Sequence, residues 1–188
     1  IQLLNLLYLQ SLDWNSDRSA LEQEVKLLDE QLRSILVKSK DLSKWIIPWA
    51  NRVAKSSEVR VSDYWLNGTG QMEGDTLVSG AYTIDGKMVI DDFLEQIKNT
   101  GRYEEILTTI LPGFEGDYKK SYLAQWENFA QNFDKGSEKL RGRNEWLTVV
   151  NNLSTGRNLY FNALNLVDQQ IEPYKDDAEL PDWATMVG

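Results

Sequence analysis

The chain contains neither cysteine nor histidine. Without cysteine it can form no disulfide, no thiolate nucleophile and no zinc site of the usual thiolate kind. Without histidine it has no Ser-His-Asp triad and no imidazole that exchanges protons near neutral pH. Because these absences remove much of the common catalytic chemistry, the composition favours a scaffold over an enzyme.

Positive charge is also scarce in this chain. It has 20 Lys and Arg residues against 29 Asp and Glu residues, which gives a formal net charge of -9. Such a chain repels phosphate backbones and anionic lipid headgroups, so nucleic acid is not an expected partner. The length of 188 residues, with 41% hydrophobic and 26% charged residues, is typical of one folded domain in water.

Long hydrophobic runs are missing as well. The most apolar stretch, residues 1–9, is about half as long as a bilayer span and lacks the layout of a signal peptide. We expect it to be the end of a packed helix. The chain begins with Ile1 instead of methionine, which indicates a processed product or a piece of a longer protein and leaves a transmembrane segment upstream open.

Helical periodicity dominates the first third of the chain. Between residues 17 and 38 the apolar residues recur at steps of three and four, which predicts an amphipathic helix. These residues are Leu21, Val25, Leu28, Leu32, Ile35 and Leu36. A second helix should follow Ser39, and Pro48 should either kink it or lie in its first turn.

The segment at 62–84 interrupts this helical pattern. Its glycines stand among short polar residues, which is the chemistry of turns and not of a continuing helix. The runs 76–78 and 81–84 could pair as a small hairpin, and extended connections without a sheet are equally compatible with them.

Helical stripes return in the second half. One helix is expected from residue 85 or 86 to 98, a short one should end at Pro112-Gly113, and a long one should cover 116–133. The long helix carries an aromatic stripe of Tyr122, Trp126, Phe129 and Phe133. Two further helices should follow Gly136 and Gly156.

The predicted fold is therefore mainly α, either a multi-helix bundle or an elongated helical domain. We expect one helical domain at 1–170, with a lead-in at 1–61, a loop-rich crossing at 62–84 and a helical part at 85–170. The remaining residues, 171–188, are expected to form an extended acidic tail that the indole of Trp183 anchors.

No motif in the chain predicts a catalytic, cofactor or metal site. The glycine-rich run at 68–74 has the wrong spacing for a phosphate loop and lacks its lysine. Paired carboxylates such as Asp91 and Asp92 point in different directions on a helix. Neither Asp75 nor Asp134 begins the alternating oxygen ligands of a calcium loop. The expectation is a protein that is not an enzyme and holds no cofactor or metal.

The order of several short fragments resembles the IcmF/TssM family, the large inner-membrane proteins of type VI secretion systems and of the Dot/Icm type IVB system. The fragments are Ser79-Gly80-Ala81-Tyr82-Thr83, Ile84-Asp85-Gly86 with the helix 87–97, Tyr122-Leu123-Ala124-Gln125-Trp126-Glu127-Asn128-Phe129, and Trp146-Leu147-Thr148-Val149-Val150-Asn151-Asn152-Leu153-Ser154. The resemblance covers about residues 62–167. It departs from the family at Ser79, where proline is common, and at Thr155-Gly156-Arg157, where a small residue and proline are common.

This resemblance implies a periplasmic, largely helical segment of an inner-membrane scaffold protein. Its membrane anchor would lie in parts of the parent chain outside this segment. The implied partners are a DotU/TssL-type inner-membrane protein and other subunits of the secretion complex. We expect any exposed aromatic contacts to come from outside the regular stripes, at Trp14, Tyr64, Trp65 and Trp183.

Two alternatives from other classes of protein stay open. A type IV pilus assembly protein of the PilN kind would place a three- or four-stranded sheet in the middle of the chain. A carboxylate-dependent cell-wall glycosidase would need an enclosed cleft with two facing carboxylates, at least one of them with a raised pKa.

Overall fold

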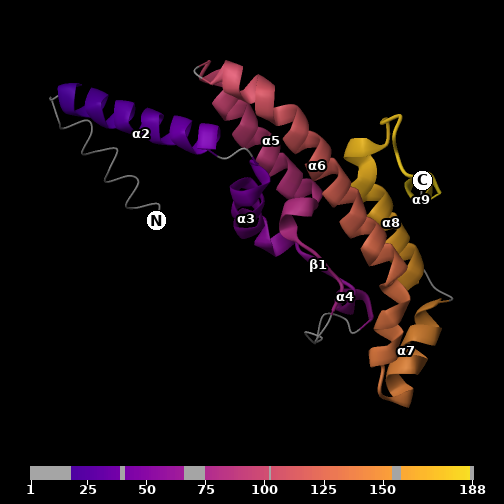
Figure 1. Ribbon diagram of the computed structural model, residues 1–188. Coiled ribbons are helices and arrows are strands. Elements are labelled where there is room, and N and C mark those ends of the chain that lie inside the picture. Colours follow the sequence, from indigo (N-terminus) through magenta and orange to yellow (C-terminus); the bar gives the residue numbers. More distant parts are fainter. Residues whose placement is uncertain (1–17, 39–40, 66–74, 102, 154–157, 187–188) are drawn as a thin grey trace.

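One long helix, α6 (Glu104–Gln131), forms the spine of the molecule in a computed structural model of the chain (Figure 1). The structure describes residues 18–38, 41–65, 75–101, 103–153 and 158–186. The mainly α prediction is confirmed, since helices make up most of these residues. None of the described helices is long and apolar enough to cross a bilayer.

The other described elements are shorter than α6. The remaining α-helices are α2 (Arg18–Lys38), α3 (Ser43–Val53), α4 (Ser62–Trp65), α5 (Ile84–Asn99), α7 (Arg143–Leu153), α8 (Leu159–Ile171) and α9 (Asp182–Thr185). Single 3-10 turns lie at Lys55–Ser57, Gly80–Tyr82 and Glu172–Tyr174, and a longer one at Phe133–Lys139. Two strands, β1 (Val59–Arg60) and β2 (Leu77–Val78), form the sheet seen in the described part of the chain.

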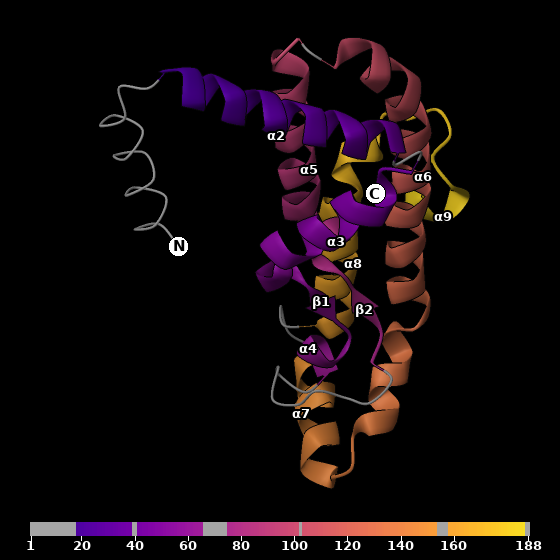
Figure 2. The same cartoon turned by 60° about the vertical axis from the view of Figure 1, so that its left-hand side comes forward.

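The helices pack along α6 in an elongated arrangement. Helices α3 and α5 contact each other and the Gly80–Tyr82 turn, while α8 packs directly against α6. Helix α2 projects from one end of this body, and α7 lies at the other end (Figures 1 and 2). The fold therefore presents two separated ends joined by a 28-residue helix.

The core is centred on the aromatic stripe of α6, as its spacing predicted. Tyr122, Trp126 and Phe129 are fully buried, and Phe133 is buried just beyond the helix. Two of these rings also hold neighbouring segments through hydrogen bonds. The Tyr122 hydroxyl donates to the Gln170 carbonyl (2.7 Å), and Trp126 Nε1 donates to the Tyr82 carbonyl (2.8 Å).

The segment before α5 folds back closely on itself. The Thr83 hydroxyl caps α5 by accepting a hydrogen bond from the Gly86 N–H (3.2 Å), and it donates to the Gly80 carbonyl (2.8 Å). The backbone at Gly80 also lies against Ala54 at the end of α3. Because Gly80 and Gly86 have no Cβ, the backbones of α3, the turn and α5 can contact each other directly.

The suggested hairpin between residues 76–78 and 81–84 does not form, because the first of these runs pairs with another strand. β2 pairs antiparallel with β1, with Val59 opposite Val78, and not with residues 81–84. Those residues belong to the 3-10 turn and to the start of α5, because their backbone groups find other partners. One of these is the Ala81 N–H, which donates to the side chain of Asn51 (2.7 Å).

The expected helix break at Pro112 is wrong, because α6 continues through it. The residues on either side, Leu111 and Phe114, are buried, whereas Pro112 and Gly113 are exposed. A proline inside a helix costs about 3 kcal/mol, and burying a large apolar side chain yields about 1.5–3 kcal/mol. Burial of two such side chains therefore outweighs the lost hydrogen bond. Pro48 likewise lies inside α3 and not in its first turn.

The prediction of an extended tail at 171–188 is also wrong. Ile171 ends α8, a 3-10 turn follows it, and α9 lies near the end of the chain. The segment is held on α6 by an ion pair between Lys119 and Asp177 and by edge-to-face packing of Tyr174 on Tyr122. These contacts fold the segment against α6 instead of leaving it extended.

Candidate functional site

Of the four aromatic residues expected at a partner surface, one is buried, two are half-buried and one lies outside the described residues. Trp14 lies outside the described residues. Tyr64 is half-buried and packs edge-to-face on Phe129 and Phe133. Trp183 is half-buried beside α6.

Trp65 is buried in the core, so the expectation of an exposed contact at this position is corrected. Its side chain is 5% exposed, its Nε1 donates to the Phe133 carbonyl (2.7 Å), and its ring packs against Phe133 and Tyr160. The indole fits inside the molecule because Gly136 has no side chain. A Cβ at Gly136 would lie 2.1 Å from Trp65 Cδ1.

The first exposed apolar surface lies on α2. We define the α2 stripe as Leu21, Val25, Leu28, Leu32 and Ile35. Three of its members are exposed, Val25 by 48%, Leu28 by 55% and Ile35 by 49%, and Leu32 packs against the core. The sequence predicted this apolar series together with Leu36, which is buried, but three of the five stripe residues face solvent.

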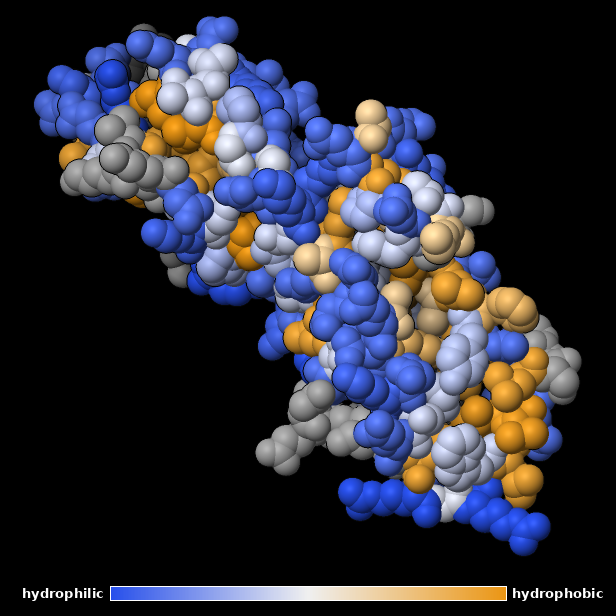
Figure 3. Space-filling view, turned by 45° about the vertical axis from the view of Figure 1, so that its right-hand side comes forward, coloured by the Kyte–Doolittle hydropathy of each residue, from blue (hydrophilic) through white to orange (hydrophobic). Residues whose placement is uncertain are grey.

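A second exposed apolar surface lies at the far end of the molecule. We define the α7–α8 patch as Trp146, Leu147, Val150, Phe161 and Leu164, which are 45% to 65% exposed. Figure 3 shows hydrophobic side chains gathered at the lower end, where α7 and α8 lie. An exposed apolar gathering of this kind is typical of a contact site.

The sequence of α8 carries a signal for this patch, because its apolar residues lie on more than one face of the helix. The core face of α8 consists of Leu159, Ala163, Val167 and Ile171, which follow one another at steps of four. Phe161 and Leu164 do not belong to that series. A helix with apolar residues on two faces has one face more than its own core needs.

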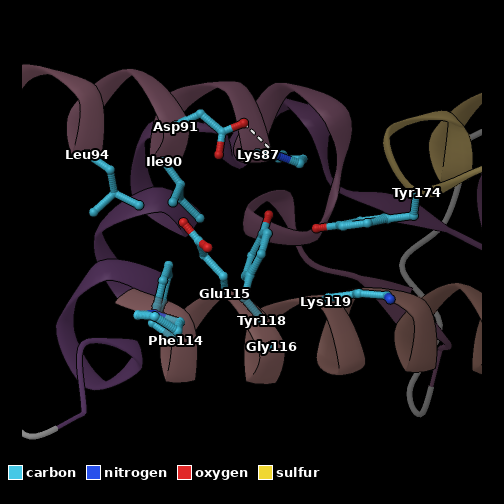
Figure 4. A pocket seen from close by; sticks show the side chains of 11 residues that line it. Lys87, Ile90, Asp91, Leu94, Phe114, Glu115, Gly116, Tyr118, Lys119 and Tyr174 are labelled. Carbon is cyan, nitrogen blue, oxygen red and sulfur yellow. Dashed lines mark hydrogen bonds and ion pairs between the residues drawn. The ribbon is translucent and has the colours of Figure 1, made fainter. Parts of the chain in front are cut away.

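A pocket of about 460 Å³ lies between α5, the first half of α6 and the C-terminal segment (Figure 4). Its walls include Tyr118 and Tyr174 and the charged residues Asp91, Glu115 and Lys119.

The lysines of this pocket are held by acidic neighbours. Lys87 Nζ lies 2.5 Å from a carboxylate oxygen of Asp91 and 5.9 Å from the centre of the Tyr174 ring. Lys119 pairs with Asp177. Asp91 is thus engaged in an ion pair, while Glu115 is exposed at the pocket wall. The arrangement favours a structural role over a pair of facing acid and base carboxylates.

Tyrosines around this pocket have strongly raised pKa values. Burial raises the pKa of Tyr118, Tyr122 and Tyr174 above the ordinary value of 10.0, and neighbouring negative charges add to the effect. For Tyr174 these charges are those of Asp91 and Glu115. The folded state therefore favours the neutral phenols.

We expect these phenols to resist ionisation as long as the protein is folded. A raised folded-state pKa adds stability that is complete below the unfolded value near 10.0 and is lost as pH rises above it. Alkaline titration followed at 295 nm should show fewer ionising groups than the 8 tyrosines of the chain, and denaturant should release the rest. Ionisation of all tyrosines with one midpoint near the ordinary value in the folded protein would contradict this assignment.

The other chemical motifs give no further site. Among the residues that the structure describes, no three Asp or Glu side chains gather as metal ligands. The glycine-rich run at 68–74 lies outside the described residues. Comparison of the chain with protein-family models, with curated proteins and with solved structures finds no match.

Proposed function

We propose that this chain is a non-catalytic scaffold segment that acts through protein–protein contacts. The observation that carries the proposal is the pair of exposed apolar surfaces, the α2 stripe and the α7–α8 patch, at opposite ends of an elongated body (Figures 1 and 3). At 1.5 Å per residue the 28 residues of α6 span about 42 Å between these ends. A rigid helix of this length keeps two bound neighbours apart.

The resemblance to the IcmF/TssM family supports a setting for this scaffold. We propose a periplasmic segment of an inner-membrane protein in a bacterial secretion complex of the type VI or Dot/Icm type IVB kind. Its partners would be a DotU/TssL-type protein and other subunits of that complex. Two of the resembling fragments have structural roles in this fold, since the segment 79–86 contacts α3 and begins α5, and the segment 122–129 carries the central rings.

The pilus assembly alternative has less support. It requires a sheet of three or four strands in the middle of the chain. The described residues there form two strands of two residues each, and helices surround them.

The test is in-cell cross-linking of the tagged full-length parent protein, followed by purification from membranes and identification of the attached proteins. We expect a DotU/TssL-type protein together with other secretion subunits. The double variant Val150→Glu/Phe161→Glu should reduce their recovery about tenfold, because charges placed on an apolar contact must be desolvated.

A matched control places the same charge on an exposed apolar residue elsewhere. Met88 on α5 is 57% exposed and belongs to neither surface, so Met88→Glu should leave the recovery unchanged. Recovery of pilus assembly proteins, or of no protein partner, would overturn the proposal. Equal losses in both variants would show that the effect does not arise at the α7–α8 patch.

A further inference from the structure

The α2 stripe has the spacing of a coiled-coil seam. Successive members lie 4, 3, 4 and 3 residues apart, from Leu21 to Ile35. A repeat of this kind averages 3.5 residues and keeps its apolar side chains along one line of a helix. The side chains of a second helix fit into such a line, whereas a broad globular surface prefers a wider stripe.

The fold holds α2 by one side and leaves three seam residues, Val25, Leu28 and Ile35, exposed. Leu36 is buried, Leu32 packs on the core, and the Tyr103 hydroxyl donates to the Asp29 carboxylate (2.5 Å). These contacts lie in the second half of the helix. The first half extends beyond α5 and α6 in both views (Figures 1 and 2).

Acidic residues border the seam. In heptad terms Glu22, Glu24 and Asp29 occupy the two positions that flank an apolar line, and Gln31 is the next flanking residue. The basic residues Lys26 and Arg33 are turned away from the seam, because both occupy heptad position b, the position after an a residue, whereas Glu22 and Asp29 follow d residues and occupy the flanking position e.

These flanking charges discriminate between possible occupants. In a parallel pair with a second copy of this chain, Glu24 of one helix would face Asp29 of the other, and the like charges would repel each other. Carboxylates beside the seam also repel an anionic lipid surface. They attract a helix whose own flanking positions carry lysine or arginine.

We propose that the α2 stripe binds a helix of another protein that has an apolar heptad seam flanked by Lys and Arg. The inference rests on the proposed function, since it names the kind of partner that one of the two contact surfaces takes. The acidic border selects this partner, and the apolar seam supplies most of the affinity.

Two synthetic helices test the inference on the 188-residue chain. Both carry leucine and isoleucine at the seam positions of three heptads; one has lysine at all flanking positions, and the other has glutamate. Each peptide repels its own copies, so both are available as single helices. We expect the lysine peptide to bind about tenfold or more tightly than the glutamate peptide in low salt, as measured by fluorescence anisotropy.

Two variants of the chain separate the contribution of charge from that of apolar contact. Glu22→Lys/Glu24→Lys should reverse the preference, so that the glutamate peptide binds more tightly. Val25→Glu/Leu28→Glu should abolish binding of both peptides. Met88→Glu, on α5, should leave both affinities unchanged. Far-ultraviolet circular dichroism of each variant shows whether its helices persist.

Several outcomes would overturn the inference. Equal binding of the two peptides, or a preference that the charge reversal does not change, would remove the role of the acidic border. A dimer of the chain alone that Val25→Glu/Leu28→Glu dissolves in sedimentation would make a second copy the occupant. Binding to vesicles with anionic lipid that the same variant abolishes would make the occupant a membrane. If the peptides fail but Val150→Glu/Phe161→Glu still removes partners from the parent protein, the inference fails while the proposed function stands.

Discussion

Gly86→Ala is expected to lower the free energy of unfolding by about 3 kcal/mol or more, because the added carbon overpacks a rigid backbone contact. A Cβ at this position would lie 2.0 Å from the Gly80 carbonyl oxygen and 2.6 Å from the Ala81 Cα. Both atoms belong to the backbone of the turn before α5, so no side-chain rotation relieves the clash. Chemical denaturation followed by circular dichroism measures the loss.

Gly116→Ala is the matched control, since it makes the same substitution in a helix. No atom lies within 4 Å of a Cβ at Gly116, and the residue is exposed on α6. Alanine should stabilise the helix there by about 0.5–1 kcal/mol relative to glycine. If Gly86→Ala raised the stability like Gly116→Ala, the close approach of α5 to the turn would be wrong.

The parts of the fold that the sequence predicts well depend on local spacing. The steps of three and four on α2 and the aromatic series on α6 predict a helix and its apolar face without reference to the rest of the chain. The pairing of β1 with β2 and the path of the chain through Pro112 were not predictable in this way. Both depend on residues such as Val78 and Phe114 being buried against segments that are distant in the sequence.

The candidate surfaces show the same limit in another form. The residues of the α2 stripe are visible in the sequence, but their exposure depends on which other segment covers them. Trp65 illustrates the converse, because it lies outside any regular stripe and yet occupies a space that Gly136 leaves open 71 residues later. A tryptophan without periodicity is therefore a weak signal for an exposed surface, and an apolar stripe beyond what the core needs is a better one.

Trp126→Ala is expected to cost about 3–5 kcal/mol of unfolding free energy, the range for large aromatic residues removed from a core. Trp126 is fully buried, packs edge-to-face on Phe129, and donates the hydrogen bond that holds the Tyr82 carbonyl. Alanine would leave a cavity at the centre of α6 and would leave that carbonyl without its Nε1 donor. Thermal and denaturant unfolding of the variant measure both consequences together.

Trp126→Phe and Trp146→Ala separate the causes of this loss. Phenylalanine keeps most of the apolar contact but removes the Nε1 donor, so its cost should be smaller, about 1–3 kcal/mol. Trp146 is 45% exposed on α7, and Trp146→Ala should change stability by less than about 1 kcal/mol. If Trp146→Ala destabilised the protein as much as Trp126→Ala, α7 would belong to the core and the α7–α8 patch would not be free for a partner. Stability close to wild type in Trp146→Ala, combined with weaker partner recovery, would instead assign that indole to binding.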